Sequence, residues 1–281
     1  MKPLRLGVIG LGELGGSVAW QATRAGVQSV IGYARNRKDG VAAVKAGAVT
    51  EVATSLKTLI KRSEFIVIDA SSSETIALLD ELAVALSGTQ VCCTDLGGVK
   101  GAVVQAAARL KLEQHFASSH PLTEVGNVGF RSARPDRFEG LVVYVTPVLR
   151  GEQVAREIAD FWQRVMQAEA VMVDAEVHDQ LVGWTSHLPQ AAASMLAATL
   201  ASSGPKGITY GPVALSATNA AVTDAAAWTD ALVHNRKVLI ELLSSFGANL
   251  DGLKTALEAG DRHSVRSWLE SGSEWRRRLG K

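Results

Sequence analysis

Two short histidine-containing motifs could carry acid–base chemistry in this sequence. Residues 118–122 read SSHPL, and a second motif consists of HD at residues 178–179 followed by SHLPQ at residues 186–190. A histidine has a pKa close to neutral pH, so its imidazole can accept a proton from a substrate hydroxyl and release it again. A lone histidine is more often structural, but several such motifs beside a redox cofactor site favour a catalytic function.

A glycine-rich motif near the N-terminus predicts such a cofactor site. Residues 10–15 read GLGELG, between a predicted strand at Leu4–Ile9 and a predicted helix at Gly15–Ala25. In this context the three glycines allow, in order, a tight turn, a close approach of the backbone to a pyrophosphate, and close packing of the helix on the strand. The helix N-terminus adds unpaired N–H groups for the phosphates. We predict a nicotinamide dinucleotide that contacts Gly10, Leu11, Gly12, Leu14 and Gly15.

The end of the second predicted strand, Ser29–Tyr33, indicates which dinucleotide is bound. An NAD site usually has Asp or Glu about 20 residues after the glycines, where it bonds the ribose 2′-hydroxyl. Ala34 stands there instead, and the guanidinium groups of Arg35 and Arg37 can bind a 2′-phosphate through charge-assisted hydrogen bonds. A solvated basic loop is the alternative interpretation. We predict NADP, with further cofactor contacts from Asn36, Ser71 and Asp95.

Strand-like and helical segments alternate in the first half of the chain. The further predicted elements are a helix around Lys38–Ala46 and strands at Phe65–Ala70, Val91–Asp95 and Leu141–Thr146. Such alternation implies right-handed crossovers and a mainly parallel sheet. After Pro147 we find helical periodicity and almost no strand signal. We therefore predict a Rossmann-type, doubly wound α/β domain over residues 1–147 and an all-helical domain for substrate binding and dimerisation over residues 148–281.

The composition excludes several classes of function. The formal net charge is +1, so no excess of charge favours a nucleic acid or an acidic membrane surface as a partner. The adjacent Cys92 and Cys93 are the only cysteines, which excludes a cysteine-rich metal site, and we predict no metal. The sequence has neither an apolar run long enough to cross a membrane nor a secretory signal pattern, so we expect a cytoplasmic protein.

Together the motifs resemble the prephenate/arogenate dehydrogenase family of tyrosine biosynthesis. The resemblance covers nearly the whole chain and includes the glycine turn, TDLGGVKG at residues 94–101 and the two histidine motifs. It implies an NADP-dependent oxidative decarboxylation of prephenate or arogenate, in which a ring hydroxyl becomes a carbonyl, hydride passes to the nicotinamide, and the ring carboxylate leaves as carbon dioxide. It also implies a homodimer formed through the helical domain.

The resemblance assigns roles to individual residues. His120 matches the catalytic histidine, and His187 matches a histidine that lines the substrate pocket. We predict that Lys100 is a second catalytic residue that supplies charge near the cofactor or substrate, while a surface lysine at a helix start is the alternative. For His178 and Asp179, a packing pair and a functional pair are equally good interpretations.

Three departures from the family pattern fall at substrate-facing positions. Gly98 replaces a serine, Gln190 replaces a second histidine, and Asn219 replaces a carboxylate-binding arginine in an alignment anchored on Trp228 and Asp230. We still predict that these three positions line the substrate pocket. Another cation would then hold the substrate carboxylate, and the candidates are Arg131, Arg134 and Lys206. The segment Thr123–Gly126 also differs from the family pattern.

Two other functions remain open at this point. A divergent relative would oxidise or reduce another cyclic acid, or a small hydroxy or imino acid. A protein that kept the fold but lost turnover would be an NADP-binding sensor. Activity on prephenate and arogenate separates the first function from both alternatives.

Overall fold

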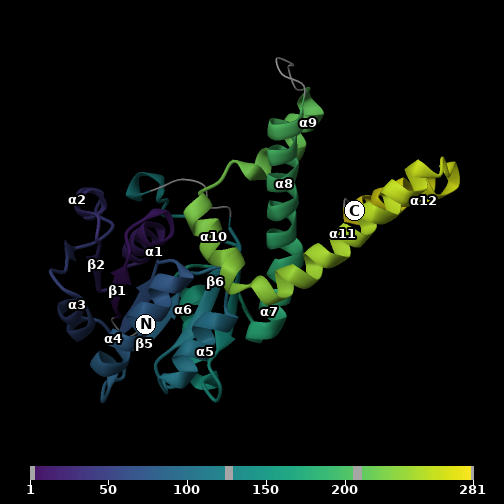
Figure 1. The fold of residues 1–281 in the computed structure, drawn as a ribbon. Coiled ribbons are helices and arrows are strands. Elements are labelled where there is room, and N and C mark those ends of the chain that lie inside the picture. Colours follow the sequence, from purple (N-terminus) through teal and green to yellow (C-terminus); the bar gives the residue numbers. More distant parts are fainter. Residues whose placement is uncertain (1–3, 124–128, 205–210, 280–281) are drawn as a thin grey trace.

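A five-stranded parallel sheet forms the centre of the N-terminal part of the chain (Figure 1). The computed structural model describes residues 4–123, 129–204 and 211–279. The strand order is β3-β2-β1-β4-β5, so the chain builds outward from β1 in both directions. The strands are β1 (Arg5–Ile9), β2 (Ser29–Tyr33), β3 (Glu51–Val52), β4 (Phe65–Ile68) and β5 (Cys92–Asp95).

Helices cover both faces of this sheet, as near-continuous apolar strands require. Successive side chains of a strand point to opposite faces. Phe65 and Val67 of β4 therefore join one apolar cluster, with α1 (Glu13–Arg24) and α6 (Glu152–Arg164). Ile66 and Ile68 join the other cluster, with α3 (Leu56–Arg62), α4 (Ser72–Leu86) and α5 (Gly101–Arg109). The fold class predicted from the sequence is confirmed.

A second, smaller sheet continues from the edge of the first. It contains β6 (Ala117–Pro121), β7 (Val142–Pro147) and β8 (Glu169–Met172), with β6 antiparallel and β8 parallel to β7. The expectation of an all-helical chain after Pro147 is wrong for β8. This strand is only four residues long, and its apolar run of three residues is too short to distinguish a strand from a helix.

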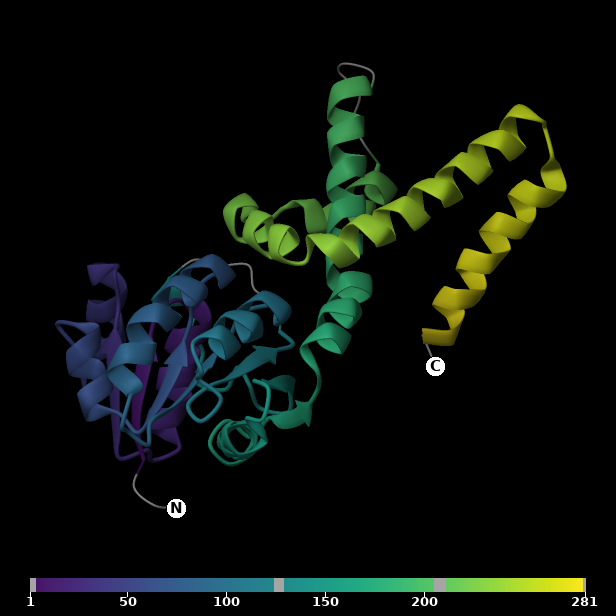
Figure 2. The same cartoon turned by 60° about the horizontal axis from the view of Figure 1, so that its bottom comes forward.

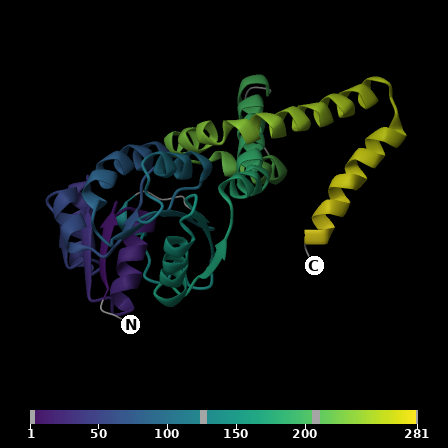
Figure 3. The ribbon, with the colours of Figure 1, turned by 90° about the horizontal axis from the view of Figure 1, so that it is seen from below.

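The remaining chain is helical and extends away from the sheets. It comprises α7 (Ala175–Val182), a single π-helical turn at Gly183–His187, α8 (Leu188–Ser203), α9 (Pro212–Ala217), a short 3-10 turn η3 (Asn219–Ala221), α10 (Ala225–His234), α11 (Arg236–Glu258) and α12 (Arg262–Leu279). Figure 2 shows α10 close to the first sheet and the α11–α12 arm standing clear of it. The view from below in Figure 3 shows the same separation.

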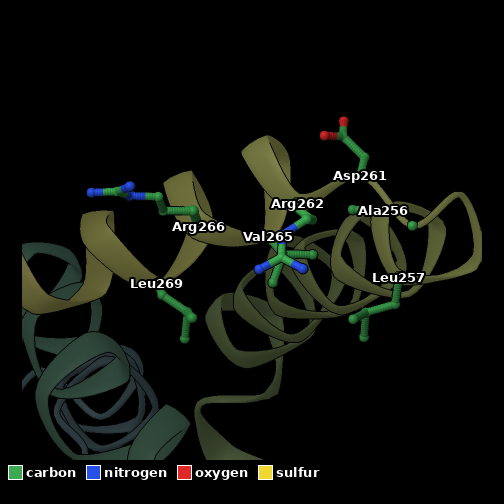
Figure 4. A pocket seen from close by; sticks show the side chains of 8 residues that line it. Ala256, Leu257, Asp261, Arg262, Val265, Arg266 and Leu269 are labelled. Atoms are coloured by element: carbon green, nitrogen blue, oxygen red, sulfur yellow. The ribbon is translucent and has the colours of Figure 1, made fainter.

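The α11–α12 arm presents apolar side chains that no other described part of the chain covers. Leu257, Leu269 and Trp275 are each more than two-fifths exposed. A hollow of about 340 Å³ lies in the angle between the two helices, where Figure 4 shows the side chains of Leu257, Val265 and Leu269. Large exposed apolar surfaces of this kind mark protein–protein contacts. Across the described residues, no helix is both long and apolar enough to span a bilayer.

Candidate active site

The glycine-rich turn has the geometry that a dinucleotide requires. Gly10 has a φ of +87°, where any side chain would be strained, and a Cβ there would clash with the backbone oxygen of Asp69. Gly12 is the N-cap of α1, and a Cβ on Gly15 would clash with the backbone oxygen of Gly10. Leu11 and Leu14 are buried in the core, so they can offer only backbone groups to a cofactor. The turn therefore fits a pyrophosphate at the N-terminus of α1.

The predicted 2′-phosphate site already contains an ion pair. Arg35 bonds to Glu74, and this bond is the main reason that the pKa of Glu74 is lowered. Ser71 caps α4 in a reciprocal capping box with the same Glu74. Asn36 caps α2 (Arg37–Lys45) by accepting a hydrogen bond from Lys38 N at 3.0 Å. Arg37 is exposed at the start of that helix.

Asp69 lies in the same site and was missed by the sequence analysis. Its carboxylate Oδ2 accepts a hydrogen bond from Gly15 N at 2.8 Å. The surrounding protein removes water from the carboxylate, which raises its pKa to about 6. The sequence contained a signal for it, because Asp69 directly follows β4, whose neighbour β1 leads into the glycine turn.

The two histidine motifs meet in a hydrogen-bonded chain. His120 on β6 bonds through Nδ1 to Nε2 of His178 at 2.9 Å, and His178 Nδ1 bonds to Oδ1 of Asp179 at 2.9 Å. The Asp179 carboxylate accepts further hydrogen bonds from the backbone N–H groups of Lys100 and Gly101, each at 2.8 Å. These interactions lower the pKa of Asp179, although burial alone would raise it.

The order of these bonds fixes the protons on both rings. A carboxylate can only accept, so His178 Nδ1 carries the proton and His178 Nε2 accepts one from His120 Nδ1. The lone pair of His120 Nε2 therefore takes part in none of these bonds. Gly98 faces this atom, since a Cβ on Gly98 would lie 3.8 Å from His120 Nε2. Because position 98 carries a glycine in place of a serine, the space directly beside His120 Nε2 is not filled by a side chain from this position.

Lys100 is fully buried and is not the surface lysine of the alternative interpretation. Its Nζ bonds to Asp95 Oδ2 at 2.9 Å and to the backbone oxygen of Ser119 at 2.7 Å. Asp95 also accepts hydrogen bonds from Gly97 N at 2.9 Å and from the hydroxyl of Ser118. Lys100 and Asp95 therefore hold the strand residues that precede His120.

His187 lies where the helical part of the chain meets the site. It is buried in the π-helical turn, and Asn235 Nδ2 lies 3.0 Å from its Nδ1 and donates to the backbone oxygen of Asp179 at 2.8 Å. Burial lowers the pKa of His187 to about 4. Asn235 was not predicted, because nothing in the sequence separates it from other asparagines. It joins His187 to the residue that supports His120.

The other predicted substrate-binding residues are less close to this chain of bonds. Gln190 is buried on α8 and bonds to Ser194 at 3.2 Å. Asn219 is exposed on η3, which packs on α8. Arg131 and Arg134 are exposed, and Arg134 pairs with Asp136 at 3.1 Å. Lys206 and residues 124–126 of the divergent segment lie outside the described residues.

Asp230 fixes the helical part of the chain to the cofactor domain. From α10 its carboxylate accepts a hydrogen bond from Ser72 N at 2.7 Å and further bonds from Ser73 N and the Ser73 hydroxyl. These N–H groups belong to the N-terminus of α4, where a negative charge is stabilised by the helix dipole. The contact positions α10 next to the end of α4 that also carries Ser71 and Glu74.

A parallel sheet with a glycine-rich turn, beside a histidine held by a hydrogen-bonded chain, is typical of a nicotinamide-dependent oxidoreductase. Two family models cover nearly the entire chain: the prephenate dehydrogenase nucleotide-binding domain matches residues 18–172 and the prephenate dehydrogenase dimerization domain matches residues 174–271. The chain belongs to the prephenate/arogenate dehydrogenase family. Among the residues that the structure describes, no three or more His, Cys, Asp or Glu side chains are arranged so that they could hold a metal ion.

Characterised relatives and solved structures agree with this assignment. The chain is 25% identical to prephenate dehydrogenase of Bacillus subtilis over 95% of its length and 74% of that protein. It is 26% identical to cyclohexadienyl dehydrogenase of Zymomonas mobilis, over 91% and 89% of the two chains. The fold matches that of A. aeolicus prephenate dehydrogenase bound to hydroxyphenyl propionate and NAD+, with a TM-score of 0.91, 23% identity and 99% of each chain covered.

Proposed function

We propose that this enzyme oxidatively decarboxylates a cyclohexadienyl acid, prephenate or arogenate, with NADP as the oxidant. The observation that carries the proposal is the open Nε2 of His120, whose Nδ1 is held by His178 and Asp179. The curated relatives act as prephenate or cyclohexadienyl dehydrogenases, which supports this substrate class. Initial rates with each acid and each dinucleotide test it, and absence of turnover with both acids at millimolar concentration would refute it.

His120 has a proton-transfer role in this proposal. Its Nε2 accepts the proton of the ring hydroxyl while hydride leaves the carbon that bears this hydroxyl. The resulting imidazolium of His120 is stabilised through His178 by the Asp179 carboxylate. The nicotinamide supplies the hydride acceptor. When the ring carboxylate departs as carbon dioxide and the ring becomes aromatic, the proton returns to the oxygen. The reaction therefore needs no reactant besides the cyclohexadienyl acid and the oxidised dinucleotide.

We propose positioning roles for the neighbouring buried residues. Lys100 and Asp95 hold the segment before His120, so neither has to contact substrate or cofactor directly. His187 and Gln190 enter the site from the helical part, and one of the exposed arginines, Arg131 or Arg134, or Lys206 binds a substrate carboxylate. We also propose that Asn219 lines the substrate pocket from η3 and that the Gly98 position admits the ring next to His120.

The dimer and the domain division also belong to this proposal. We propose a homodimer formed through the helical part, supported by the match to a dimerization domain and by the exposed apolar side chains of the α11–α12 arm. Because β8 pairs with β7, we propose a domain boundary near Val173 in place of the sequence-based boundary after residue 147. Light scattering tests the dimer.

The rate is expected to be insensitive to mild acid. The pKa of His120 is held well below 6.5, first by burial and further by the charges of Lys100 and His178. Its Nε2 therefore stays unprotonated, and kcat/KM at saturating dinucleotide should change by no more than about twofold between pH 7.5 and pH 6. A fall approaching tenfold per pH unit in this range would contradict the assignment.

The NADP preference is expected to depend on Arg35 and Arg37. Replacing either by alanine should raise KM for NADP roughly 10-fold or more and leave KM for NAD nearly unchanged, because only NADP carries the 2′-phosphate. Glu74→Gln should lower KM for NADP, since it releases Arg35 from its ion pair. Arg164→Ala on α6, where the arginine is exposed and pairs with Asp160, is the control. A wild-type enzyme that prefers NAD tenfold would rule out the NADP proposal.

A further inference from the structure

The dinucleotide site contains a carboxylate, that of Asp69, with which no cation of the described residues forms an ion pair. Asp69 is bonded to Gly15 N at the start of α1, and a Cβ on Gly12 would lie 3.2 Å from the same Oδ2. The N-terminus of α1 is the part of the fold that a pyrophosphate approaches. Asp69 therefore places a negative charge where the cofactor brings further negative charges.

The acidic neighbours of Asp69 each have a cationic partner, whereas Asp69 has none among the described residues. Glu13 on α1 and Glu74 on α4 act on Asp69 through their charges, and each of them forms an ion pair, Glu13–Arg137 and Glu74–Arg35. Among the described residues, no lysine or arginine forms an ion pair with Asp69. A pyrophosphate beside an ionised Asp69 would thus meet an unscreened like charge.

A protonated Asp69 removes this repulsion and offers a new contact. The neutral carboxyl group can still accept the Gly15 N–H through one oxygen and can donate its O–H to a phosphate oxygen. Its pKa in the free protein is about 6, raised first by the loss of water around the carboxylate and further by the charges of Glu13 and Glu74. Adding an anion raises the pKa of a carboxyl group further.

We propose that Asp69 takes up a proton when the nicotinamide dinucleotide binds, and that its neutral carboxyl group then helps to hold the pyrophosphate on the N-terminus of α1. The proposal rests on the proposed function only for the identity of the ligand. Because the protonated form binds, affinity is highest below pH 6 and falls as the pH rises above it.

Calorimetric titration of the full-length protein with NADP+ and with NAD+, in the absence of substrate, tests the proposal. The titrations are done at pH 7 in two buffers of different ionisation enthalpy. The wild type should take up about 0.9 proton per dinucleotide, because a carboxyl group with a pKa near 6 is about 90% ionised at pH 7. Between pH 6 and pH 8 its Kd should increase by up to about tenfold per pH unit.

Two variants separate Asp69 from other sources of pH dependence. Asp69→Asn should abolish the proton uptake and flatten the pH dependence of Kd, and comparing both proteins with the same dinucleotide cancels titration of the ligand's own phosphates. If the Asp69→Asn variant does not fold, Asp69→Ser is used in its place, since the serine hydroxyl can also accept a hydrogen bond from Gly15 N. Asp136→Asn, which removes an exposed carboxylate, should keep the wild-type uptake.

The failures of the two proposals are distinguishable. Dinucleotide binding by the wild type without proton uptake, or with uptake that persists undiminished in Asp69→Asn, would overturn the role of Asp69 and leave the proposed function intact. Absence of binding by either dinucleotide would overturn both.

Discussion

Replacing His120 by asparagine is expected to lower kcat by about 10²- to 10⁴-fold, the usual contribution of a general acid–base catalyst. Asparagine retains a polar side chain but has no lone pair that can take up the proton of the ring hydroxyl near neutral pH. The predicted contacts of the dinucleotide lie on the first sheet and its loops, whereas His120 lies on β6 of the second sheet, so Kd for NADP should change by no more than about twofold. Stopped-assay rates and fluorescence titration of the dinucleotide measure the two quantities.

A matched control separates this effect from general damage. His115 precedes β6 and bonds to the backbone oxygen of Val91 at 3.0 Å, away from the hydrogen-bonded chain of His120. His115→Asn should therefore retain most of the turnover. An unchanged kcat in His120→Asn, or an equal loss in kcat and in dinucleotide affinity, would remove His120 from the proposed role.

Replacing Lys100 by methionine is expected to lower the free energy of unfolding by about 3–5 kcal/mol. The substitution leaves the Asp95 carboxylate fully buried without its cation, and an uncompensated buried charge is strongly destabilising. Urea unfolding at pH 7.5 measures the change. The double variant Lys100→Met/Asp95→Asn should recover much of the loss, because the remaining amide is neutral.

An exposed ion pair provides the comparison for this prediction. Lys254 and Glu258 lie 3.8 Å apart on α11, and both side chains are about two-thirds or more exposed. Lys254→Met should change the free energy of unfolding by less than about 1 kcal/mol. Two results would show that the buried pair does not stabilise this segment. One is that Lys100→Met lowers the free energy of unfolding no more than Lys254→Met does; the other is that the double variant Lys100→Met/Asp95→Asn is no more stable than Lys100→Met.

The local parts of the fold and site were predictable from the sequence. The turn at Gly10–Gly15 combines a strand, three glycines and a helix within a short stretch, and each of these is determined by neighbouring residues. The strands β1, β2, β4, β5 and β7 are apolar enough to be recognised. By contrast, β6 was missed because most of its residues are polar, although it carries His120, and β3 and β8 were missed because they are only two and four residues long.

The contacts between distant residues were not predictable in the same way. His120 and His178 are 58 positions apart, and they are brought together by the packing of α7 against α5 and β7, the strand that pairs with β6. Asn235 acts at the same point from the start of α11, and Asp69 reaches the glycine turn from β4. Residue type alone does not distinguish Asn235, because asparagine is common at helix ends, whereas the position of Asp69 directly after β4 was a signal that its type did not add to. Tertiary structure alone determines these interactions.

The most direct test of the central claim is the stoichiometry of a single reaction mixture. With limiting prephenate or arogenate and excess NADP+, we expect equal amounts of NADPH, carbon dioxide and an aromatic product, measured by absorbance, isotope release and mass spectrometry. This equality requires that hydride transfer and loss of the ring carboxylate occur on the same substrate molecule. NADPH formed without an equivalent of carbon dioxide would contradict oxidative decarboxylation at this site.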